Sequence, residues 1–90
     1  MNITYDQLVK VIEDSTAVIV DFDALTFPYV NNEDERYIEV SWDSPDGFIQ
    51  HYIYESEVTS ITYNEESSWY VVNMIEDTFY TIQPLIVATP

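Results

Sequence analysis

The side chains best suited to chemistry are the carboxylates of residues 31–46. Six acidic residues stand in this segment against one basic residue, Arg36; they are Glu33, Asp34, Glu35, Glu39, Asp43 and Asp46. An ionised carboxylate offers only hydrogen-bond acceptors, and its strongest partners are the cationic groups of lysine and arginine. The segment is therefore suited to binding a positively charged surface.

The whole chain repeats this imbalance. Seventeen Asp and Glu residues face only Lys10 and Arg36, which gives a formal net charge of −15, while 47% of the residues are hydrophobic and 16% aromatic. That content is too high for a disordered acidic tail and suffices for a single acidic domain over residues 1–90. Solubility needs a net charge of magnitude only about 2 to 8. The excess predicts a basic partner protein.

The sequence lacks the residues that several other functions require. Without cysteine there is no thiolate nucleophile, and the only histidine, His51, has no recognisable catalytic partner. The single glycine, Gly47, excludes a glycine-rich phosphate loop, and placing it at position 6 of a calcium loop puts Trp42 and Ile53 where acidic ligands are needed. Two basic residues cannot form a nucleic-acid-binding patch. We therefore predict no enzymatic activity, no cofactor or metal, and no direct binding of nucleic acid.

The spacing of the acidic residues also carries information. Residues i and i+2 on a strand point the same way about 6.6 Å apart, so Asp21/Asp23, Glu33/Glu35 and Glu55/Glu57 are expected to form outward pairs in a phosphate-like repeat. Together with the cluster in residues 31–46, these pairs define the predicted partner-binding residues: Asp21, Asp23, Glu33, Asp34, Glu35, Glu39, Asp43, Asp46, Glu55 and Glu57.

The elements that must position these side chains begin with a helix over residues 3–14. Thr4 and Gln7 have the spacing of a capping box, and Asp6 falls in the first turn, where the helix dipole favours a negative charge. The i, i+3, i+4, i+7 stripe of an amphipathic helix is filled by Tyr5, Leu8, Val9 and Ile12. We expect this stripe to pack against the rest of the domain.

Most of the remaining chain predicts strands, over residues 17–22, 37–42, 48–54, 58–63, 69–75 and 78–82. Pro28 makes residues 25–30 an edge segment or a loop, and Pro84 is expected to end the last strand, leaving residues 85–88 as an apolar tail or a final edge strand. Residues 69–82 could instead form a helix. The predicted fold class is α+β, with the N-terminal helix packed on an antiparallel sheet of about five strands.

The predicted strand over residues 37–42 alternates cleanly. Ile38, Val40 and Trp42 share one face, and Glu39 lies on the other. The turn at residues 43–47 then joins this strand to the next one in a hairpin. The outward candidates among the eight tyrosines are Tyr37, Tyr52, Tyr54 and Tyr63, which either stack on arginine side chains of a partner or pack half-buried on the sheet.

A rigid protein with carboxylates at such spacing could occupy the positive groove of a DNA-binding protein in place of DNA. In size, charge and aromatic content the chain resembles the small acidic DNA-mimic inhibitors of bacteriophages, and among them the anti-restriction nuclease proteins of T-even phages. The resemblance implies a homodimer whose acidic faces together simulate a length of duplex. Its target would be a host defence nuclease: a restriction endonuclease, including a modification-dependent one, or a CRISPR effector.

Two other functions are consistent with the same composition. An immunity protein or antitoxin that neutralises a basic nuclease toxin is also small and acidic, and electrostatic steering speeds its capture of the toxin. A halophile protein has an acidic surface that retains hydration. The sequence has no export signal and no apolar run of about 18 residues, so we expect a cytoplasmic location, in the host cell if a phage encodes the protein, and no membrane partner.

Overall fold

The computed structural model of the protein describes residues 1–85. Its helices are α1 (Tyr5–Glu13) and the short 3-10 helix η1 (Glu55–Glu57). The strands are β1 (Asn2–Ile3), β2 (Ala17–Val20), β3 (Ala24–Thr26), β4 (Tyr29–Asn31), β5 (Tyr37–Ser44), β6 (Gly47–Tyr54), β7 (Val58–Asn64), β8 (Trp69–Met74) and β9 (Phe79–Leu85).

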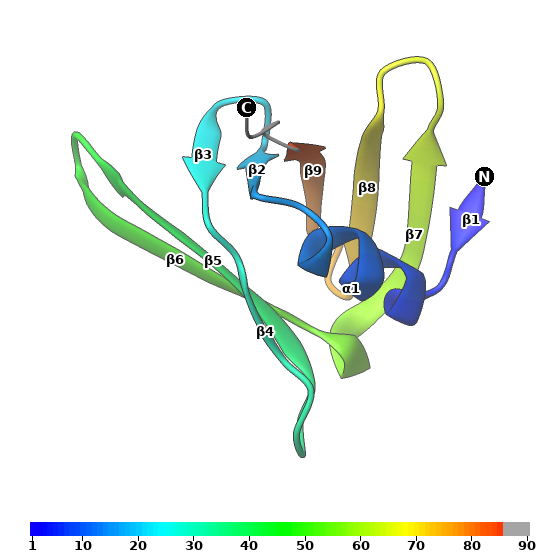
Figure 1. The fold of residues 1–90 in the computed structure, drawn as a ribbon. Coiled ribbons are helices and arrows are strands. Elements are labelled where there is room, and N and C mark those ends of the chain that lie inside the picture. Colours follow the sequence, from blue (N-terminus) through cyan, green and yellow to red (C-terminus); the bar gives the residue numbers. More distant parts are fainter. Residues whose placement is uncertain (86–90) are drawn as a thin grey trace.

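The α+β class is confirmed, and the predicted number of strands is wrong. The described residues form two antiparallel sheets, one of six strands in the order β1-β7-β8-β9-β2-β3 and one of three in the order β4-β5-β6 (Figure 1). The prediction of about five strands in one sheet missed the two-residue strand β1, and it treated the three-residue strands β3 and β4 as a single edge segment or loop. Such short strands leave little periodic signal in a sequence.

The predicted helix over residues 3–14 is confirmed as α1, which begins two residues later, at Tyr5, after the predicted capping box. The Thr4 hydroxyl accepts a hydrogen bond from the Gln7 amide at 3.1 Å, and the Gln7 side chain accepts one from the Thr4 amide at 2.8 Å, which completes the capping box. The apolar stripe, Tyr5, Leu8, Val9 and Ile12, is buried. The helix covers one face of the six-stranded sheet (Figure 1).

Of the two predictions that rest on a proline, one is confirmed and the other is wrong. Pro28 lies between β3 and β4, each of which is an edge strand of its sheet, so the prediction of an edge segment is confirmed. Pro84 does not end β9, because Pro84 still pairs with Val18 of β2. A proline is tolerated here because the pairing of β8 with β9 stops at Ile82, so the missing N–H falls on an open edge. Residues 86–88 of the predicted apolar tail lie outside the described residues.

The other predicted strands are confirmed with shifts of one to three residues at their ends, and residues 69–82 form parts of β8 and β9 rather than a helix. A single core joins the layers: Ile38, Val40 and Ile53 of the β5–β6 hairpin are fully buried and belong to one cluster with Leu8 of α1 and Val72 of β8. The hairpin is therefore fixed to the domain by its inward face. Within residues 1–85, no helix is long and apolar enough to cross a membrane.

A buried threonine ties the two sheets together. Thr26 of β3 is 2% exposed, and its hydroxyl donates a hydrogen bond to the Ser41 carbonyl at 2.6 Å and accepts one from the Ser41 amide at 3.3 Å. Ser41 lies in the middle of β5. This contact, together with the shared core, fixes the orientation of the β5–β6 hairpin relative to the six-stranded sheet (Figure 1).

Candidate functional site

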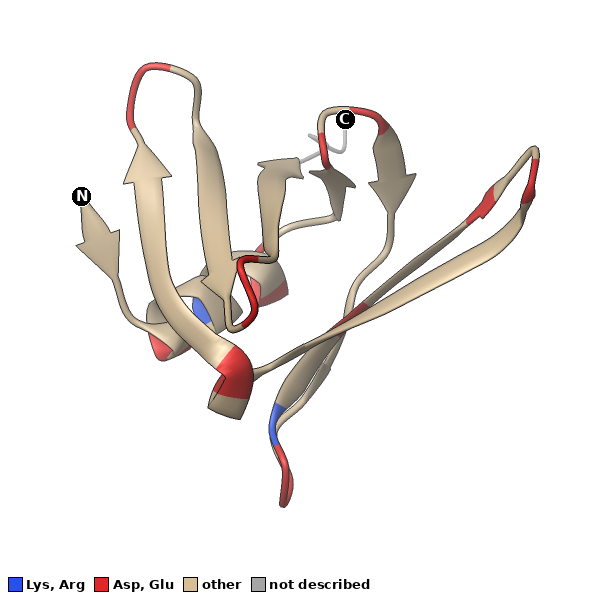
Figure 2. Cartoon of the chain, turned by 180° about the vertical axis from the view of Figure 1, so that it is seen from behind, with Lys and Arg blue, Asp and Glu red and all other residues tan. Residues whose placement is uncertain are grey.

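The acidic segment predicted from the sequence runs along one β-ribbon. We call the acidic ribbon the six carboxylates carried by the β4–β5 loop, by β5 and by the β5–β6 turn: Glu33, Asp34, Glu35, Glu39, Asp43 and Asp46. Five of them are exposed, and Glu39 is half-buried. In Figure 2 the red loop between β4 and β5 and the red turn of the β5–β6 hairpin lie at opposite ends of this ribbon. The chain thus distributes the cluster over the length of the hairpin.

Strand alternation turns part of this cluster outward. The inward side chains of β5 include Ile38 and Val40, both 0% exposed. Tyr37, Glu39 and Asp43 have the opposite parity and therefore face away from the core. The predicted alternation of this strand is confirmed.

Glu39 lies among four tyrosines on the outward face of the three-stranded sheet. Glu39 is the register partner of Tyr29 on β4 and of Tyr52 on β6. Tyr37 joins the rings into one group, which we call the tyrosine cluster: its ring centroid lies 6.3 Å from that of Tyr29, 5.4 Å from that of Tyr52 and 5.6 Å from that of Tyr54. A carboxylate is therefore set within an aromatic surface.

Hydrogen bonds hold the Glu39 side chain in place. The Gln50 side chain donates a hydrogen bond to Glu39 Oε2 at 2.5 Å, and the Tyr52 hydroxyl is also hydrogen-bonded to this carboxylate. Partial burial, the negative charge of Glu39 and this hydrogen bond raise the pKa of Tyr52. Partial burial and the charges of neighbouring groups also raise the pKa of Tyr37. Tyr37 and Tyr52 are therefore neutral at neutral pH and offer hydroxyl donors beside the Glu39 carboxylate.

Arg36, the only arginine, points to the inward side. Its guanidinium group lies 2.7 Å from Asp6 and 3.0 Å from Glu55, and it stacks 5.0 Å from the centre of the Tyr5 ring. Arg36 therefore links the β4–β5 loop to α1 and to η1. Among the described residues, neither basic side chain lies on the outward face of the three-stranded sheet, because Lys10 is on α1, where it pairs with Asp14 at 3.4 Å.

The Tyr5 hydroxyl beside Arg36 predicts a loss of stability at alkaline pH. Burial raises the pKa of Tyr5 to about 12, an effect that the Arg36 charge partly opposes. Because the folded pKa lies above the unfolded value of about 10, this contribution is complete below pH 10 and is lost as the pH rises towards 12. We expect Tyr5→Phe to make the fall in stability between about pH 10 and pH 12 shallower, as measured by urea unfolding.

The same substitution has an internal control near neutral pH. The Tyr5 hydroxyl is buried and makes no hydrogen bond within residues 1–85, so its removal leaves no partner unsatisfied. Tyr5→Phe should therefore leave the free energy of unfolding at about pH 8 unchanged or slightly higher. If the free energy of unfolding of Tyr5→Phe falls as steeply between about pH 10 and pH 12 as that of the original chain, the role given to Tyr5 is wrong.

Four of the ten predicted partner-binding residues lie outside the acidic ribbon. Asp21 and Asp23 are in the β2–β3 turn, and Glu55 and Glu57 are the first and last residues of η1. The prediction that these two pairs lie on strands is wrong, and it is also wrong for Glu33/Glu35, which lie in a loop, so the strand repeat of about 6.6 Å does not apply to them. Asp21 instead closes its turn with a positive φ of 52°, and its carboxylate accepts a hydrogen bond from the Thr81 amide at 3.1 Å.

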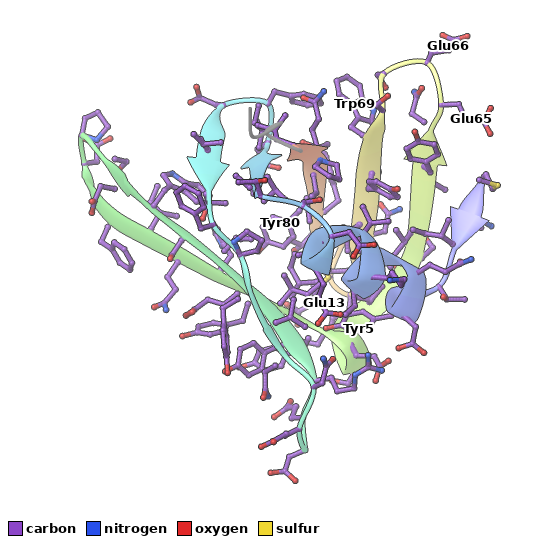
Figure 3. All side chains as sticks on the ribbon, viewed as in Figure 1. Tyr5, Glu13, Glu65, Glu66, Trp69 and Tyr80 are labelled. Carbon is purple, nitrogen blue, oxygen red and sulfur yellow. The ribbon has the colours of Figure 1, made fainter. Side chains whose placement is uncertain are left out.

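The remaining carboxylates are concentrated at turns and helix ends. Glu65 and Glu66 lie at the tip of the β7–β8 hairpin, and Glu13 is the last residue of α1 (Figure 3). The red segments of Figure 2 therefore occur at turns and helix ends on several sides of the molecule, while the strands of the six-stranded sheet contain no charged residue. The acidic ribbon differs from these turns because it is continuous with the tyrosine cluster.

Sequence reasoning missed two residues of this face and misplaced one. Tyr29 lies in the segment around Pro28, which was predicted as an edge segment or a loop, and Gln50 was not singled out on the predicted strand over residues 48–54. Tyr63 is not part of the cluster: it lies on β7, with its ring centroid 4.7 Å from that of Tyr70 on β8. The alternation of residues 50, 52 and 54 was the available signal for Gln50.

His51 lies on the inward face of β6. It is half-buried, and its Nδ1 atom is 3.1 Å from the Tyr80 hydroxyl, which Figure 3 shows in the interior between the hairpin and the six-stranded sheet. This contact connects the two sheets. Within residues 1–85, no three His, Asp or Glu side chains are grouped so that they could hold a metal ion.

The net charge predicts that salt stabilises the fold. Fifteen unbalanced negative charges repel one another, and screening shortens the range of this repulsion from about 30 Å at 0.01 M salt to about 3 Å at 1 M. We expect the melting temperature to rise by about 5 °C over this range, the shift that about 1 kcal/mol gives in a domain of this size. A melting temperature that stays constant or falls in differential scanning calorimetry would contradict this expectation.

The arrangement as a whole offers carboxylate acceptors and aromatic faces to a cationic ligand. Its acceptors are spread along a ribbon, and its rings are held by cross-strand packing. Comparison with protein-family models, with curated proteins and with solved structures finds no match for this chain.

Proposed function

We propose that this protein is a stoichiometric inhibitor that occupies the DNA-binding groove of a host defence nuclease. The observation that carries the proposal is the acidic ribbon, which presents six carboxylates along one hairpin, with no basic side chain on the outward face among the described residues. A groove built for DNA obtains much of its affinity from lysine and arginine contacts to phosphates. The same cations can pair with the ribbon, and electrostatic steering speeds the encounter.

The ribbon reproduces the charge of DNA only coarsely. The ribbon carries six carboxylates, whereas one turn of duplex of about 34 Å carries about 20 phosphate charges, at one per about 1.7 Å. The ribbon would therefore engage a subset of the cations in the groove. If two copies associate, as the resemblance to phage DNA mimics implies, two ribbons would extend the mimic. The proposed site of action is the cytoplasm of the host cell.

The test uses the tagged full-length chain to capture partners from bacterial lysate. We expect a basic DNA-binding protein to be retained, and to be released by excess duplex DNA and by salt. Retention of a partner that duplex DNA does not release would contradict groove occupation and favour the immunity protein, which can block a toxin outside its DNA-binding groove. A chain that retains no basic protein would reject both functions.

A further inference from the structure

We infer that the outward face of the three-stranded sheet is an arginine-recognition surface, on which a guanidinium group stacks against the tyrosine cluster and pairs with Glu39. The inference rests on the proposed function in one respect, since it takes the partner to be a basic protein. It adds the kind of side chain that the partner presents and the place where that side chain binds. The occupant is an arginine exposed in the groove of the partner.

The first argument is the position of the charge. Within residues 1–85, Glu39 is the only charged residue in the central part of the face, and its register partners on either side are Tyr29 and Tyr52. Because Glu39 is half-buried among rings, its field is screened less than that of a carboxylate on a loop. The other five charges of the acidic ribbon are also negative, and Arg36 is paired with Asp6 and Glu55, so an anion or a second acidic surface is disfavoured. The face selects a cation.

The second argument is the remaining hydrogen-bonding capacity of Glu39. A carboxylate has about four acceptor positions. Gln50 donates one hydrogen bond to Glu39 Oε2, the Tyr52 hydroxyl lies beside the same carboxylate, and Glu39 accepts no further hydrogen bond within residues 1–85. Arginine presents paired N–H donors in a planar fork that matches two such acceptors, whereas lysine presents a single compact point charge.

The third argument is the exposed aromatic surface. Tyr29 is 56% exposed and Tyr52 is 38% exposed, although the rings of the cluster pack against one another. A guanidinium plane can lie flat on such a ring, and its weak hydration makes this contact less costly than for an ammonium group. At exposed sites a cation–π contact changes affinity by a factor of about 2 to 5. The expected preference for arginine over lysine is of this size.

The experiment measures binding of a tetra-arginine peptide and a tetralysine peptide to the full chain by NMR titration. We expect the arginine peptide to bind about threefold more tightly, and its side-chain protons to shift upfield because they lie over tyrosine rings. Tyr37→Leu combined with Tyr52→Leu should abolish the preference. The matched control is Tyr63→Leu combined with Tyr70→Leu, which removes another cross-strand ring pair and should keep the preference.

A second pair of variants preserves folding if the leucine variants do not fold. Glu39→Gln can keep the hydrogen bond from Gln50 but removes the charge, and it should weaken binding of the arginine peptide more than Glu66→Gln, which removes one exposed charge at the β7–β8 turn. Equal affinities for the two peptides, or equal effects of these two variants, would overturn the inference. If the inference fails while duplex DNA still releases the captured partner, the proposed function stands.

Discussion

Neutralising the acidic ribbon is expected to weaken binding of the captured partner by about 60-fold. The variant replaces each Glu of the ribbon by Gln and each Asp by Asn, at positions 33, 34, 35, 39, 43 and 46. Each exposed ion pair contributes a factor of about two to affinity, and six such factors multiply to about 60. Single substitutions should have small effects, because the six carboxylates share one field. Biolayer interferometry at fixed salt gives the affinity and both rate constants.

The control for this variant neutralises the same number of carboxylates elsewhere. Glu13, Asp14, Glu65, Glu66, Glu76 and Asp77 lie at the end of α1 and in the β7–β8 and β8–β9 turns. Both variants change the formal net charge from −15 to −9, since each removes six negative charges. If the ribbon is the binding face, the control should lose affinity only through slower association. Equal losses in the two variants would show that net charge, and not the ribbon, determines binding.

The fold could be predicted from the sequence wherever local rules decide it. The capping box at Thr4 and Gln7 and the alternation around Glu39 are short-range signals, and both were confirmed. The division into two sheets could not be predicted, because it depends on long-range contacts. One of them is the pair of hydrogen bonds between Thr26 and Ser41, residues that are fifteen positions apart. No periodic pattern reports such a contact.

The candidate site was predicted as a set of residues, but its geometry was not. Residues 31–46 were identified by composition, and their common ribbon follows from the hairpin that alternation already indicated. Asp21 was expected on a strand, but the chain turns there with φ of 52° and leaves the sheet. Tyr29 joined the cluster only through its pairing with Glu39 across strands. Register between strands is a tertiary property, so the aromatic surface had to be read from the structure.

The inward face of the same hairpin carries the largest expected effect on stability. Ile53 of β6 is 0% exposed and pairs in register with Ile38 of β5, which is also fully buried. Truncation of a fully buried isoleucine to alanine costs about 2–5 kcal/mol. Domains of this kind have a total stability of about 5–15 kcal/mol, so Ile53→Ala should lower it severely, as measured by urea unfolding. Ile75→Ala is the control, because Ile75 is 46% exposed and should change stability by less than about 1 kcal/mol.

Combining the two experiments separates stability from recognition along one strand pair. Ile53→Ala should lower the free energy of unfolding but leave the affinity of the folded fraction nearly unchanged, because Ile53 faces the core. The variant with all six carboxylates of the acidic ribbon neutralised should show the opposite pattern. It loses affinity, while its stability is equal or higher because like charges have been removed. Alternating residues of one hairpin would then have different roles: inward side chains stabilise the fold, and outward side chains bind the partner. The two faces are not independent if neutralising the six carboxylates of the acidic ribbon unfolds the chain. The same conclusion follows if folded Ile53→Ala binds the partner weakly.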